Sequence, residues 1–184
     1  MRHNLTFILL CVGLFGLTAC SKKENKPDKK GADITAEIIL GSGKKVDFSY
    51  SMDKFDFFHG PDEDGNGYII QLYPRTIVDG ITYSIMIDAR INGSGKAGEG
   101  SYTFHETLGH DDKGVLIRVG IQSDPTDVGT LDAYASKVDN PGGLVITSFS
   151  DHHISGTFSG IMNSEISNDA PSVTIKNGKF SFDF

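Results

Sequence analysis

The stretch Ile81–Ile91, ITYSIMIDARI, decides the fold, because apolar and polar residues alternate along almost its whole length. Its odd-numbered positions are all apolar or aromatic, and its even-numbered positions are polar except for Met86. Successive side chains of a β-strand point to opposite faces, so this period of two puts one set in a core and the other in water. The stretch therefore predicts a long strand in an antiparallel sheet with one solvated face.

The same period of two recurs on both sides of this strand. Ile34–Leu40 and Lys45–Tyr50 flank the turn residues Gly41–Lys44, and this arrangement predicts a hairpin. Further strands are predicted at residues 68–72, 115–121 and 130–138, of which the last also fits a short helix.

The C-terminal segment Ser172–Phe184 predicts a second hairpin. Asn177-Gly178 lies between two alternating runs, and Asn-Gly is the strongest short signal for a two-residue hairpin turn. Such a turn would put four apolar side chains on one face, namely Val173, Ile175, Phe180 and Phe182. The alternative is a single bulged strand with Gly178 in the bulge.

These short strands, separated by turn residues and without a convincing helix, define an all-β domain. We expect residues 34–184 to form one antiparallel β-sandwich of about ten strands. The alternative is a closed, lipocalin-like barrel, which would enclose a ligand cavity.

The N-terminus carries an export signal. Residues 5–19 are apolar or small and follow Arg2, but this run is too short to span a bilayer as a helix. It ends in Leu17–Cys20 (LTAC), which resembles the lipobox of bacterial lipoproteins. The resemblance implies that residues 1–19 are a signal peptide, that Cys20 is acylated, and that the lipid holds the protein on a membrane.

Residues 20–33 are predicted to form a disordered tether behind the acylated cysteine, because they are rich in charge and poor in apolar side chains. By resemblance to Gram-negative lipoproteins, Ser21 implies the outer membrane. The Lys/Glu cluster that follows is similar to the charged export tags of Bacteroidetes-type surface lipoproteins, so both periplasmic and surface-facing positions stay open.

Charge and cysteine content exclude several functions. The formal net charge is −7, and residues 34–184 alone hold eleven Lys/Arg against twenty-one Asp/Glu, a net charge of −10. Such an acidic body argues against nucleic acid as a partner. Cys11 lies in the signal peptide and Cys20 carries lipid, so the mature chain has no thiol for catalysis or metal binding.

A second resemblance concerns two segments near the C-terminus. Ile154–Gly160 (ISGTFSG) and Val173–Phe180 (VTIKNGKF) resemble the C-terminal half of small all-β Bacteroidetes-type lipoproteins of unknown function. This resemblance implies a fold and a location, but no activity.

One loop matches the first half of an EF-hand calcium loop. Asp62, Asp64 and Asn66 occupy the first, third and fifth ligand positions, and Gly67 follows them at the sixth. The twelfth position, which should be a bidentate Glu, is Tyr73. Calcium is therefore the candidate cofactor, and an acidic hairpin loop is the alternative.

Two other motifs invite chemical interpretations. His105 and His110, with His153 from a distant loop, would give a zinc site if the loops met, although H-E-x-x-x-H spacing does not suit one helix face. Gly93–Gly98 reads G-x-G-x-x-G, but another strand pattern follows it instead of a helix, so we expect a hairpin loop.

From these features we expect a non-enzymatic envelope lipoprotein with a binding or scaffolding role. Its partner would be an envelope protein or another ligand, which the sequence does not identify. The alternatives are a lipocalin-like carrier of small ligands and a calcium- or zinc-dependent enzyme.

Overall fold

The computed structural model describes residues 32–52, 57–63, 65, 67–105, 112–124 and 126–183. Within these residues the chain forms twelve strands and two short 3-10 turns, which confirms the all-β prediction. The strands are β1 (Ala32–Ile39), β2 (Lys45–Met52), β3 (Phe57–Pro61), β4 (Tyr68–Leu72), β5 (Arg75–Val78), β6 (Ile81–Ile91), β7 (Gly100–Thr103), β8 (Gly114–Gln122), β9 (Leu131–Ser136), β10 (Gly142–Ser150), β11 (His153–Ser164) and β12 (Val173–Asp183). The 3-10 turns are η1 (Gly95–Gly98) and η2 (Val128–Thr130).

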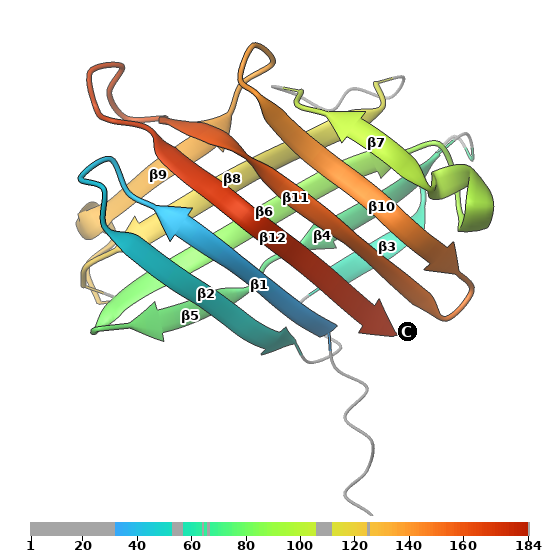
Figure 1. Cartoon of the computed structure of the whole chain (residues 1–184), viewed down its shortest axis with the longest axis horizontal. Helices are drawn as coiled ribbons and strands as arrows, with labels where there is room; N and C mark the ends of the chain where they lie inside the picture. Colours follow the sequence, from blue (N-terminus) through green and yellow to red (C-terminus); the bar gives the residue numbers. More distant parts are fainter. Residues whose placement is uncertain are drawn as a thin grey trace, which may run out of the picture.

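The strands form one antiparallel sheet that curls over into two layers, like half of a barrel (Figure 1). Its main path runs β2-β1-β12-β11-β9-β8-β6-β4-β3, and β10 pairs with β11 and β7 while β5 pairs with β6. The sheet passes between layers at β11, because residues 153–160 pair with β10 and residues 162–164 pair with β9. The strands of the two layers cross at a steep angle in Figure 1.

The core lies between the layers, and β6 contributes the largest uninterrupted row to it. Tyr83, Ile85, Ile87, Ala89 and Ile91 have no exposed area, as the alternating pattern predicts. They belong to one apolar cluster with side chains from both layers. The curled, two-layered sheet is consistent with a sandwich or with a barrel-like fold.

Most of the predicted strands are confirmed. Residues 34–40 and 45–50 form the β1–β2 hairpin, and β1 begins at Ala32, two residues inside the segment that we assigned to the tether. The ambiguous residues 130–138 contain strand β9, which pairs with β8.

The predicted C-terminal hairpin is wrong, because Val173–Asp183 is a single strand with a bulge. This strand lies between β1 and β11, and its register shifts against both neighbours around Asn177. Asn177 has a φ of 54°, a left-handed conformation that Asn tolerates better than most residues. Pairing on both edges satisfies more backbone groups than a local hairpin would, and the bulge accommodates the Asn-Gly pair.

The bulge also explains why four apolar residues still share one face. Val173 and Ile175 precede the extra residue, whereas Phe180 and Phe182 follow it, and all four are buried. One inserted residue reverses the inward parity of a strand, so odd positions face the core before the bulge and even positions face it afterwards.

Glycine and phenylalanine oppose each other twice between β11 and β12. Gly156 is the register partner of Phe180, and Phe158 is the partner of Gly178. A Cβ atom on Gly156 would lie 2.5 Å from Phe180 Cζ, and one on Gly178 would lie 2.7 Å from Phe158 Cδ2. Each ring therefore covers the glycine opposite it, and these four residues come from the two segments that resemble Bacteroidetes-type lipoproteins.

The segment Gly93–Gly98 is a connection between layers and not the hairpin loop that we expected, because β7 pairs with β10 and not with β6. The Tyr102 hydroxyl accepts a hydrogen bond from the backbone N–H of Asn92 and donates one to the carbonyl of Gly98. A Cβ atom on Gly98 would lie 2.7 Å from Phe149 Cδ1. Close packing accounts for this glycine without a bound phosphate.

Replacing Tyr83 by phenylalanine is expected to stabilise the protein. The Tyr83 hydroxyl is buried and has no hydrogen-bond partner, and an unsatisfied buried polar group costs roughly 1–3 kcal/mol. The free energy of unfolding should rise by about 1 kcal/mol in chemical denaturation. A decrease would contradict this expectation and would indicate a bound water on the hydroxyl.

Candidate functional site

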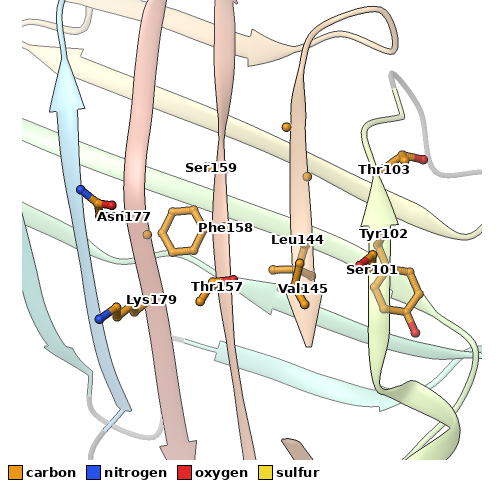
Figure 2. A pocket seen from close by; sticks show the side chains of 13 residues that line it. Ser101, Tyr102, Thr103, Leu144, Val145, Thr157, Phe158, Ser159, Asn177 and Lys179 are labelled. Carbon is orange, nitrogen blue, oxygen red and sulfur yellow. The ribbon is translucent and has the colours of Figure 1, made fainter. Parts of the chain in front are cut away.

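A groove crosses the outer face of the layer formed by β7, β10, β11 and β12 (Figure 2). Its volume is about 460 Å³. We call it the outer groove, and define it by its lining residues, which are Ser101, Tyr102, Thr103, Gly142, Gly143, Leu144, Val145, Thr157, Phe158, Ser159, Asn177, Gly178 and Lys179.

The sheet register arranges the outward-facing residues of the outer groove in two rows across the strands. In the first row Val145 opposes Ser101 on one side and Thr157 on the other, and Thr157 opposes Lys179. Neighbouring strands lie about 4.8 Å apart, so side chains recur along the row at that interval, with the apolar Val145 between Ser101 and Thr157.

The second row runs beside the first. Gly143 opposes Thr103 and Ser159. Asn177, in the bulge of β12, also lines the groove. Gly143 has a φ of 153°, which favours glycine, and a Cβ atom there would collide with the carbonyl oxygen of Tyr102. The middle of the groove is therefore a hollow beside Val145.

The floor and rim of the outer groove differ in chemistry. Tyr102, Leu144 and Phe158 are buried, so the inward-facing residues form a floor that is continuous with the core. The rim offers four hydroxyl groups, one amide and the ammonium group of Lys179. Among the described lining residues none carries a carboxyl group.

The outer groove was missed at the level of sequence. The stretch TFSG at residues 157–160 alternates a hydroxyl with an inward-facing residue, and this is the local signal that was present. Which strands lie beside it follows from the long-range pairing of β11 with β10 and β12, which one strand's pattern does not contain.

Asp62, the first residue of the candidate calcium loop, is buried in an ion cluster. Its Oδ2 atom accepts hydrogen bonds from Arg90 Nη2 at 3.2 Å and Arg90 Nε at 3.3 Å, and lies 3.5 Å from Lys113 Nζ. Its Oδ1 atom has no hydrogen-bond partner. Burial acts to raise the pKa of Asp62, but the backbone hydrogen bond of Gly67, the Arg90 guanidinium and the Lys113 charge together lower it below its usual value.

Asp64 and Asn66 lie outside the described residues, so the calcium loop stays a prediction. Asp62 itself forms ion pairs with Arg90 and Lys113. These pairs connect the β3–β4 turn to β6 and to the residue that precedes β8.

The histidines proposed for zinc are not brought together where the structure describes them. Thr103 pairs with Gly143 at one end of β10, and Ser150 pairs with His153 at the other end, roughly 23 Å away at 3.3 Å per residue. His105 follows β7 at the first end, and His110 lies outside the described residues. His153 Nδ1 lies 2.7 Å from Asp183 Oδ1. Within the described ranges no group of three His, Cys, Asp or Glu side chains is placed to hold a metal ion.

The lipidation residue Cys20 lies outside the described residues. Among the residues that are described, no helix is long and apolar enough to cross a membrane.

A histidine–tyrosine pair was not anticipated from the sequence. His59 Nδ1 lies 2.6 Å from the Tyr68 hydroxyl, and the Phe57 ring stacks on the imidazole at a centroid distance of 5.6 Å. Burial lowers the pKa of His59 and raises the pKa of Tyr68. Both pKa shifts favour the neutral form of the side chain. In these forms His59 Nδ1 can accept a hydrogen bond from the Tyr68 hydroxyl.

The pair predicts a stability change between pH 7.5 and pH 5. The pKa of His59 in the folded protein lies below its unfolded value of 6.5. The stability that comes from burying the neutral imidazole is therefore complete above pH 6.5 and decreases as the pH falls below it. We expect the wild-type Tm to fall on acidification and His59→Gln to reduce this fall. His152→Gln, at an exposed position, is the control and should leave it unchanged. Equal falls in the wild type and His59→Gln would contradict the assignment.

Comparison of the chain with protein-family models, with curated proteins and with solved structures gave no match. The site is therefore interpreted from its own residues.

Proposed function

We propose that this protein is a lipid-anchored lipoprotein of the outer membrane, facing the periplasm or the cell surface, and that its β-domain binds an envelope component. The proposal of a lipid anchor rests on the position of Leu17–Cys20 at the end of an apolar run of signal-peptide length. Two or three acyl chains, at about 0.8 kcal/mol per buried methylene, would make the attachment stable.

The binding role is supported by the outer groove. Its hydroxyl-bearing rim surrounds a hollow on a rigid sheet, and sites on regular elements hold their groups in fixed geometry. Eleven residues separate Cys20 from Ala32, and a flexible segment of that length would have a root-mean-square reach of about 18 Å. The domain would therefore stay close to the membrane while its groove remained accessible.

Labelling with an alkyne fatty acid tests the anchor. The wild-type protein should take up the label and move to the membrane fraction, and globomycin should block cleavage before Cys20. Cys20→Ala should abolish labelling, whereas Cys11→Ala, the matched control inside the signal, should not. Labelling that survives in Cys20→Ala would refute the proposal. Protease treatment of intact cells then distinguishes surface-facing from periplasmic protein.

A further inference from the structure

The outer groove combines features that an ordinary solvated sheet face does not require. It is hollowed in its middle at Gly143, beside the outward-facing Val145, and its rim carries hydroxyls on both sides of that hollow. Val145 supplies an exposed apolar surface in the middle of the groove, where it is 38% exposed. The groove therefore combines hydroxyl groups with an apolar patch, as a ligand with both kinds of surface requires.

The charge of the outer groove opposes the charge of the domain. Lys179 is exposed and has no ion-pair partner among the described residues, and it stands at one end of the first row. The described lining contains no carboxylate, although residues 34–184 carry a net charge of −10. An anionic ligand would therefore meet a local positive charge at Lys179 on a domain whose net charge is negative.

Along β10 and β11 the groove offers no free strand edge to an extended peptide. Strands bind peptides by pairing at a free edge, where main-chain N–H and C=O groups are available. Here β10 is paired with β7 and β11, and β11 is paired with β10 and β12. A ligand that lies on these two strands must therefore use their side chains, whose hydroxyl groups both donate and accept hydrogen bonds, as the hydroxyls of a sugar also do.

We infer that the outer groove binds an acidic saccharide that lies across the strands. This inference rests on the proposed binding function and names its ligand class. A sugar ring would place its C–H face on Val145 and in the Gly143 hollow. Its hydroxyls would exchange hydrogen bonds with Ser101, Thr157 and Ser159. Lys179 lies two strands from Val145 and its side chain extends toward β1 in Figure 2, so it would meet the carboxylate of the next sugar along the saccharide.

The test uses the mature, acylated protein that begins at Cys20, in a zwitterionic detergent without a sugar headgroup. The probes are an oligogalacturonate and a neutral gluco-oligosaccharide of equal length, titrated by calorimetry at low salt. Lys179→Met should weaken oligogalacturonate binding about tenfold, and Thr157→Val should weaken it roughly two- to tenfold. Higher salt should reduce the effect of Lys179, because its charge is exposed.

Two matched variants serve as controls. Lys176→Met removes the same charge from the same strand outside the groove, and Thr35→Val removes a hydroxyl from the strand beside Lys179. Neither should change the affinity. No measurable binding of oligogalacturonate, equal binding of the neutral oligosaccharide, or an equal loss in the controls would overturn the inference. Fatty-acid labelling of Cys20 does not depend on any of these results, so failure of the ligand assignment is distinguishable from failure of the anchor.

Discussion

Replacement of Phe158 by alanine is expected to lower the free energy of unfolding by about 3–5 kcal/mol, the usual cost of a Phe-to-Ala change in a core. Phe158 is 2% exposed, and its ring covers Gly178 on the neighbouring strand. The substitution would remove the apolar contacts of the ring. It would also expose the backbone of Gly178 to water, because glycine has no side chain to cover it. For a domain of this size the corresponding fall in Tm is roughly 10 °C.

Phe58→Ala is the matched control, because Phe58 is 53% exposed and loses little on truncation. Gly178→Ala tests the other half of the pair. Its Cβ atom would collide with the carbonyl oxygen of Phe158 and lie 2.7 Å from Phe158 Cδ2, so overpacking should cost roughly 1–3 kcal/mol. Chemical denaturation measures all three. A Phe158→Ala loss no larger than that of Phe58→Ala would contradict the role of the ring.

Replacement of Arg90 by methionine should destabilise the protein several times more than replacement of Arg118. Arg90 and Asp62 are both buried, and removing one partner leaves the Asp62 carboxylate with Lys113 and without its guanidinium. Arg118 and Glu165 form an exposed pair, for which the loss is at most about 1 kcal/mol. Thermal unfolding of the two variants gives the comparison.

A double variant separates the loss of the ion pair from the loss of packing. Asp62→Asn combined with Arg90→Met removes both buried charges and leaves only the partly exposed Lys113 without Asp62, so it should be more stable than Arg90→Met alone. The pKa of Asp62 is lowered in the folded protein. The contribution of its carboxylate to the free energy of unfolding is therefore present above about pH 4 and decreases as the pH falls further. Equal stability of the single and double variants would show that the buried charge carries no penalty.

The sequence predicted those features that depend on neighbours along the chain. Alternation gave the position and the buried face of Ile81–Ile91, and turn residues gave the β1–β2 hairpin. Asn177-Gly178 misled the prediction because its local preference for a turn is outweighed by pairing with β1 and β11 on both edges. Long-range pairing is not encoded in the pattern of a single strand.

The candidate site illustrates the same limit. Asp62 was selected by a loop motif, yet its role depends on Arg90 and Lys113, which lie 28 and 51 residues away in the chain. The two rows of the outer groove likewise combine residues from four strands, and none of the individual positions stands out in sequence.

The register between β1 and β12 has a consequence for how the domain would stand on a membrane. Asp33 opposes Ser181, so the first strand begins beside the end of the last one, as Figure 1 also shows. Ile39 opposes Thr174 at the far end, where the loops 40–44 and 165–172 lie. In a protein tethered through its N-terminal residue, both chain ends would leave from the membrane-proximal pole. An antibody would therefore reach an epitope or a tag in the distal loops more readily than one at the C-terminus.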